Sequence, residues 1–179
     1  MIPLLQGLVQ YSDSLSAFFE HREQSHLAFR PLYRSVSRNY PEWVYQVGFN
    51  PGLRAGFRFF LIELERITEL FFSIHYLIQS DIDFTLFQDL CDVFSKTIQK
   101  NQELFDVLIV YFSEGNIKNM DSDFGHDIAE LEKKLQQIIP RDLELLDLSP
   151  HYLTLTALVL DLKDVRKLLL QLIAALPES

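Results

Sequence analysis

One stretch of the sequence constrains the fold more than any other, because its apolar residues recur at alternating intervals of four and three. The series is Leu53, Phe57, Phe60, Leu64, Ile67, Phe71, Ile74 and Ile78. Residues at this spacing lie along one side of an α-helix, and a seven-residue period packs that side against a nearly parallel or antiparallel helix. We therefore expect a long bundle helix that begins at Asn50-Pro51, an N-cap acceptor followed by a residue that needs no amide partner.

Comparable apolar series predict the other helices. The first helix extends from Ile2 to about Asn39 and is either continuous or divided near Pro31, because proline lacks an amide hydrogen and crowds the preceding turn. The next after the 53–78 helix is capped by Asp81 or Asp83 and ends at Gly115-Asn116. Its buried side is predicted to consist of Phe84, Phe87, Cys91, Phe94, Ile98, Asn101, Phe105, Leu108 and Phe112.

Two helices are expected in the last third of the chain. A shorter one starts at Asp121 or Ser122 and is stopped by Pro140, and its apolar residues are Phe124, Ile128, Leu131, Leu135 and Ile138. The last opens at Ser149-Pro150. Its inward residues are Leu155, Leu158, Leu162, Val165, Leu169, Leu172 and Leu176.

These segments indicate an all-α fold, an elongated antiparallel bundle of four to five long helices. Helices of this length bury their apolar sides only by lying alongside one another. With 179 residues the chain is long enough for one core, so we expect a single domain over residues 1–179. The one long irregular connection is expected at residues 40–52, which break the helical period.

Composition and charge exclude several classes of protein. The single cysteine, Cys91, falls on an apolar helical stripe and is expected to be a buried thiol in a reducing compartment. The first 80 residues carry seven Arg and seven acidic residues, so the net charge of −9 belongs entirely to residues 81–179. Binding to nucleic acid is not expected, because it requires a basic face. No stretch is apolar for long enough to span a membrane.

No pattern of residues predicts catalysis or a cofactor. Glu23-x-x-His26 has the spacing of a di-iron motif, but such a site needs a second copy and two more inward glutamates, and Asp123-x-x-His126 lies where a helix begins. His21, His75 and His151 have no nucleophile at a diagnostic spacing. We therefore expect no metal site, no cofactor and no enzymatic activity. Asn101, an amide within a Phe-rich stripe, is expected to fix helix register.

The candidate site is a group of arginines beside an aromatic loop. Arg30, Arg34 and Arg38 repeat at intervals of four, and Arg54 and Arg58 do so at the start of the next helix. The loop between them carries Tyr40, Trp43, Tyr45 and Phe49. Five guanidinium groups near a helix N-terminus would suit phosphate, carboxylate or anionic lipid head groups. The alternative is that acids such as Glu42 and Glu63 pair with them.

The same region carries a resemblance to a known family. The runs Tyr40-Pro41-Glu42-Trp43-Val44-Tyr45-Gln46-Val47-Gly48-Phe49-Asn50-Pro51-Gly52-Leu53-Arg54 and Gly56-Phe57-Arg58-Phe59-Phe60-Leu61, with Leu64-Glu65, resemble the fusaric acid resistance family of bacterial inner-membrane efflux proteins. That family has blocks of membrane helices followed by cytosolic helical domains. This chain has no such block, so the resemblance implies a cytosolic domain on the cytoplasmic side of the inner membrane. It assigns no substrate-binding residue to any position.

Two functional hypotheses follow. The first is a non-catalytic interaction module of an efflux transporter, which packs on its own membrane domain or associates with itself. The second is a free-standing soluble adaptor or effector that binds a partner through exposed helix faces, for instance the leucine-rich segment 168–176. An enzyme is the least favoured reading. The native gene context separates the first two, because the transporter module requires membrane helices in the same reading frame.

Overall fold

The computed structural model describes residues 2–21, 54–79, 82, 84–115, 125–138 and 149–176. In this part of the chain the structure is all-α, with five α-helices, a short 3-10 helix and no strand. The elements are α1 (Ile2–His21), α3 (Arg54–Ile78), the 3-10 helix η1 (Phe84–Phe87), α4 (Gln88–Glu114), α5 (His126–Ile138) and α6 (Ser149–Ala174). The predicted helical bundle is confirmed for these residues.

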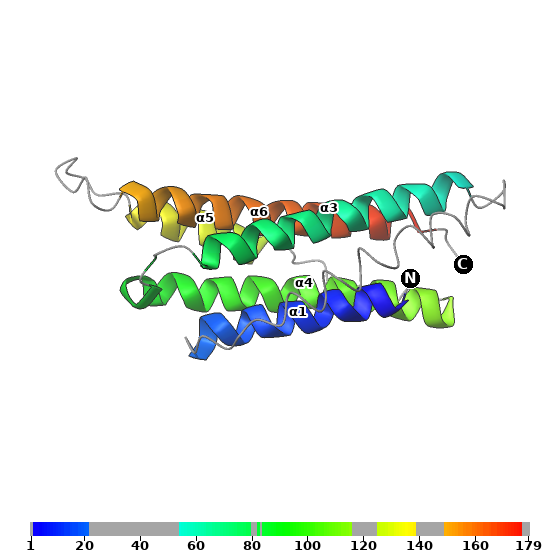
Figure 1. The fold of residues 1–179 in the computed structure, drawn as a ribbon, viewed down its shortest axis with the longest axis horizontal. Helices are drawn as coiled ribbons and strands as arrows, with labels where there is room; N and C mark the ends of the chain where they lie inside the picture. The colour runs from blue at the N-terminus through cyan, green and yellow to red at the C-terminus, as the bar shows by residue number, and fades with distance from the viewer. Residues whose placement is uncertain are drawn as a thin grey trace.

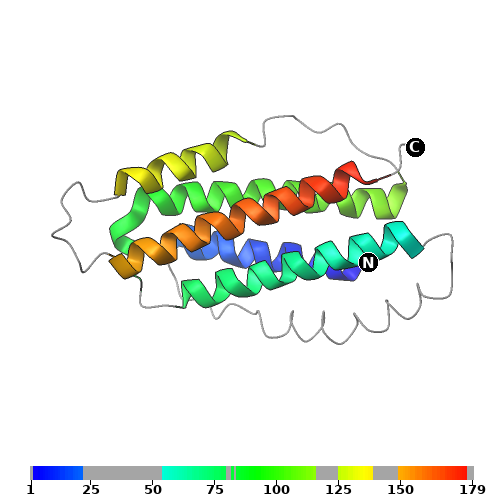
Figure 2. The same ribbon diagram turned by 90° about the horizontal axis from the view of Figure 1, so that it is seen from above.

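The helices lie side by side in two layers (Figure 1). One layer holds α1 and α4, which pack along each other, and the other holds α3, α5 and α6. Within the second layer α3 packs along α6, while α5 and α6 both contact α4. The colour gradient in Figure 2 shows that α1, α3 and α5 run in one direction and that α4 and α6 run in the other. Each packed pair is therefore antiparallel except α4 with α6.

The apolar series predicted from the sequence form the core. In α6 all seven of the predicted inward residues are buried, from Leu155 to Leu176. In α3 the described members of the series are buried as well, from Phe60 to Ile78. Aromatic rings join three helices at mid-bundle: Tyr11 of α1 meets Phe71 of α3 at a centroid distance of 5.4 Å, and Phe71 stacks on Phe105 of α4 at 6.1 Å.

The contact between α1 and α4 also contains a cluster of polar side chains. The hydroxyl oxygens of Ser16 and Ser95 lie 2.7 Å apart, and Ser95 donates a hydrogen bond of 2.7 Å to Oε1 of Glu20. Gln99 donates to the same carboxylate oxygen at 2.8 Å. Because serine is small, the two backbones approach closely here, and the hydrogen bonds satisfy groups that the contact removes from water.

Some predicted helix ends differ from the structure. The helix predicted after Gln79 is divided into the 3-10 turn Phe84–Phe87 and α4, which begins at Gln88 without a side-chain N-cap. The predicted caps, Asp81 and Asp83, lie outside the described residues. The helix α5 begins at His126, after a bend at Gly125, so the predicted start at Asp121 or Ser122 is too early. The end of α4 was predicted correctly: Gly115 has φ 76° and its amide donates to the carbonyl of Tyr111.

Candidate functional site

Most residues of the arginine and aromatic site lie outside the described part of the chain. These are Arg30, Arg34 and Arg38 and the loop residues Tyr40, Trp43, Tyr45 and Phe49. Arg54 is the first residue of α3, and Arg58, one turn later, is exposed. The convergence of the five arginines beside the loop therefore stays a prediction. Glu63, one of the acids considered as a partner, is buried and pairs with Arg66 at 3.0 Å.

The described residues contain no group of three or more His, Cys, Asp or Glu side chains placed to hold a metal ion. Glu23 lies outside these residues, as does His26. Cys91 is buried, as expected, and its thiol donates a long hydrogen bond to the carbonyl of Phe84 at 3.7 Å. Across the same described segments, none of the helices has the length and apolar character needed to cross a membrane.

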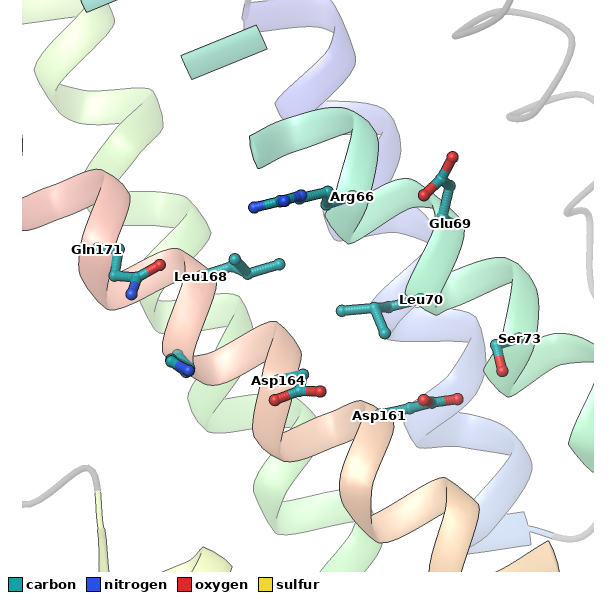
Figure 3. Close-up of a pocket in the computed structure, with 9 residues that line it drawn as sticks. Arg66, Glu69, Leu70, Ser73, Asp161, Asp164, Leu168 and Gln171 are labelled. Carbon is teal, nitrogen blue, oxygen red and sulfur yellow. The ribbon is translucent and has the colours of Figure 1, made fainter. Parts of the chain in front are cut away.

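A polar groove of about 490 Å³ lies between α3 and α6 (Figure 3). From α3 it is lined by Arg66, Glu69, Leu70 and Ser73. From α6 it is lined by Asp161, Asp164, Lys167, Leu168 and Gln171. Figure 3 shows Leu70 and Leu168 pointing toward each other between the two helices, with the charged side chains around them. The groove thus combines an apolar contact with three carboxylates and two cationic groups.

Asp161 is the most perturbed group of the groove. Burial raises the pKa of its carboxyl above the ordinary value of 3.8, a hydrogen bond from Ser73 opposes this shift, and the negative charge of Asp164 adds to it. Its Oδ2 atom is buried and accepts no hydrogen bond from the described residues. An acceptor shielded from water without a donor is costly, so this oxygen is a place where an added donor would stabilise the structure.

Exposed apolar side chains occur on the same two helices. On α3 they are Phe59, Ile62, Phe72 and Tyr76, with exposed fractions from 38% to 73%. On α6 they are Leu153, at 65%, and Leu160, at 53%. We call these six residues together with the polar groove the α3–α6 face. Figure 2 looks down onto α6 and α3, which lie in front of α4 and α1 in that view.

A second polar centre, which was not predicted from the sequence, surrounds Arg166 in the core. Arg166 is 3% exposed, and its Nη2 donates to Oδ2 of Asp127 at 2.8 Å and to the carbonyl of Thr97 at 3.1 Å. Its Nε donates to Oδ1 of Asn101. The only sequence signal was an arginine that directly follows Val165 in the apolar series of α6. Because Asn101 and Thr97 are on α4 and Asp127 is on α5, this centre joins three helices.

This second centre has no access to solvent sufficient for a substrate, since Asp127, Asn101 and Arg166 are each at most 5% exposed. Asn101 is buried here and accepts a hydrogen bond from Arg166, and its role in fixing helix register stays a prediction. The α3–α6 groove is open and its lining contains neither His nor Cys. Its carboxylates and cationic groups can form ion pairs with a bound partner, and its apolar walls can contact apolar side chains of that partner.

No protein-family model, curated protein or solved structure matches the chain.

Proposed function

We propose that the chain is a non-catalytic helical interaction domain that binds another protein surface through its α3–α6 face. One observation carries this proposal: six exposed apolar side chains lie on α3 and α6, the same two helices that line an open polar groove. Single exposed apolar residues are ordinary on a protein surface. A set gathered along one pair of helices, and rich in aromatic residues, is typical of binding surfaces.

The setting is a further part of the proposal. The resemblance of residues 40–65 to the fusaric acid resistance family supports a cytosolic module of a bacterial inner-membrane efflux protein, with its own membrane domain as a partner. The alternative is a free-standing adaptor, which would use the same face on a soluble partner. Sequencing the native gene separates the two: membrane helices in the same reading frame support the first, and a reading frame that ends with this domain rejects it.

Photo-crosslinking in the native host tests the binding face directly. A benzophenone amino acid placed at Tyr76 or Leu153 should give a protein adduct of defined mass, because both positions are exposed on the α3–α6 face. Gln136, which is exposed on α5, is the matched control position. Equal or absent crosslinking at all three positions would reject the proposed function. The mass of the adduct also distinguishes a second copy of the chain from a different protein.

A further inference from the structure

The exposed residues of α3 follow a pattern that is complementary to itself. One row along the helix, at intervals of three and four, consists of Phe59, Ile62, Arg66, Glu69, Ser73 and Tyr76. Residues at this spacing occupy one side of a helix. Of the six, all but Ser73, which is partly buried, are exposed. At the centre of the row are a cation, Arg66, and an anion, Glu69. An aromatic residue is at each end, Phe59 at one and Tyr76 at the other.

The centre of this symmetry lies midway between Ile67 and Thr68. Counted from that point, Arg66 and Glu69 are equally distant, as are Phe59 and Tyr76. When two identical helices pack antiparallel across a two-fold axis through this point, each residue faces its counterpart on the other copy. Arg66 then faces Glu69 twice, and Phe59 faces Tyr76 twice. Ile62 faces Ser73, which pairs an apolar residue with a small polar one. A two-fold interface requires such a self-complementary surface.

The groove beside the row carries charges of both signs. Asp161 of α6 lies beside Ser73 of α3, and Lys167, which also lines the groove, is six residues further along α6. The antiparallel packing of α3 and α6 places Arg66 toward Lys167, and it places Ser73 beside Asp161. One end of the groove is therefore cationic and the other is acidic. A two-fold axis through α3 places the two α6 helices on opposite sides of the axis, so the α3 rows and not the grooves form the contact.

We infer that the partner of the α3–α6 face is a second copy of this chain, bound antiparallel about a two-fold axis that passes between Arg66 and Glu69. This inference rests on the proposed function and names its partner. The charge complementarity of the row supports a second copy over an unrelated protein, since an unrelated partner would not require the row to mirror itself. Glu63 accepts hydrogen bonds from Nη1 of Arg66 at 3.0 and 3.2 Å, and the Arg66 side chain is 61% exposed, so it can contact a second copy.

The area of the face can be estimated from helix geometry, and it indicates a weak association. The row from Phe59 to Tyr76 is about 26 Å long at 1.5 Å per residue, and two helices are about 20 Å wide. Each copy would bury about 500 Å², so the total of about 1,000 Å² lies at the lower limit for a specific interface. Dimerisation is accordingly weak, and it requires measurement at protein concentrations of about 0.01 to 1 mM, where complexes of micromolar affinity form.

Charge exchange at the centre of the row tests the inference in solution. The wild-type chain should show concentration-dependent dimerisation by sedimentation equilibrium at about 0.15 M salt, where long-range repulsion between acidic chains is screened. Arg66→Glu and Glu69→Arg should each weaken it about a hundredfold, because like charges then meet across the axis. The double variant R66E/E69R should restore the wild-type affinity. An equimolar mixture of the two single variants should form heterodimers.

Lys133→Glu is the matched control, since it makes the same change in net charge as Arg66→Glu at an exposed position on α5, and it should leave the affinity unchanged. Circular dichroism checks that every variant remains folded. A wild-type chain that stays monomeric up to about 1 mM overturns the inference, as does dimerisation that the single variants do not weaken or the double variant does not restore. If Tyr76 crosslinks a different protein while the chain is monomeric, the proposed function stands and only this inference fails.

Discussion

Among the described ion pairs, we expect the buried pair of Arg166 and Asp127 to be the one whose substitution lowers stability most. Both side chains are almost fully removed from water, at 4% and 6% exposure. A buried pair of this kind contributes little over an apolar pair of the same size, but the loss of one partner leaves an uncompensated charge in the core. The amide nitrogen of Asn101 and the hydroxyl oxygen of Thr97 are buried and bond to no described residue, so the polar groups of this centre are incompletely paired.

Asp127→Asn should therefore reduce the free energy of unfolding by about 3 to 5 kcal/mol, because Arg166 loses its counter-ion. Urea unfolding followed by circular dichroism measures the change. The ion pair of Lys163 with Glu132 joins the same two helices at the surface and serves as the control. Glu132→Gln should change stability little, since exposed pairs are screened by water. Equal effects of the two substitutions would show that the Arg166 charge is satisfied in another way.

The carboxyl of Asp161 gives a prediction with a defined pH dependence. Since burial raises its pKa in the folded state, the folded chain holds this proton to a higher pH than the unfolded chain does. The stability that it contributes is present below the ordinary value of 3.8 and is lost as the pH rises through the raised pKa. Above that pKa the ionised carboxylate opposes folding.

Asp161→Asn should therefore be more stable than the wild type at pH 7, and the difference should shrink as the pH falls toward 4. Unfolding in urea at several pH values, at a protein concentration too low for self-association, measures this. Asp92→Asn, at an exposed position of α4, is the control that reports general effects of charge. If the stability of Asp161→Asn relative to the wild type instead increases toward low pH, the cationic groups Arg66 and Lys167 lower the pKa of Asp161 more than burial raises it.

Sequence periodicity predicted the helices and the apolar side chains that they bury. It did not predict the polar contacts between helices. The series of α3, α4 and α6 were identified because a seven-residue period is visible in one segment at a time. The groove was not predicted, because Ser73 and Asp161 are far apart in sequence and meet only through the packing of α3 on α6. The start of α5 was placed too early, since polar residues near a helix start can cap at several positions.

The end of α4 supplies a test of one helix terminus. Gly115 adopts φ 76°, a left-handed conformation that costs a residue with a Cβ atom about 1 to 2 kcal/mol. No atom lies within 4 Å of a Cβ added there, so the cost is conformational and not steric. Gly115→Ala should lower the free energy of unfolding by about 1 kcal/mol, and Gly115→Asn by less. Chemical denaturation measures both.

Gly125 is the control for this substitution. It also has open space around its Cα, but its backbone does not lie in the left-handed region. Gly125 is the N-cap residue of α5, where alanine is less favourable than glycine, so Gly125→Ala should lower stability by less than Gly115→Ala does. If both alanine variants lose the same stability, the effect at Gly115 comes from the solvation of the terminus and not from the left-handed backbone.

For the molecule as a whole, the antiparallel bundle makes the direction of self-association measurable. The longest helix among the described residues, α4, has 27 residues and is about 40 Å long, so the bundle is elongated along the helix axes. A two-fold axis across the middle of α3 places two bundles side by side. The dimer is then wider than the monomer and only slightly longer. Association through the ends of the bundle would instead add about 40 Å to the maximum dimension.

Small-angle X-ray scattering over a series of concentrations separates these arrangements. The wild type at high concentration should have twice the scattering mass of Arg66→Glu and a similar maximum dimension, because the second copy lies along the first. The Arg66→Glu chain provides the monomer reference, which includes the segments that the structure does not describe. An increase in maximum dimension by about the length of α4, together with the doubled mass, would place the contact at the ends of the helices. The arginines predicted near the start of α3 would then be the next residues to substitute.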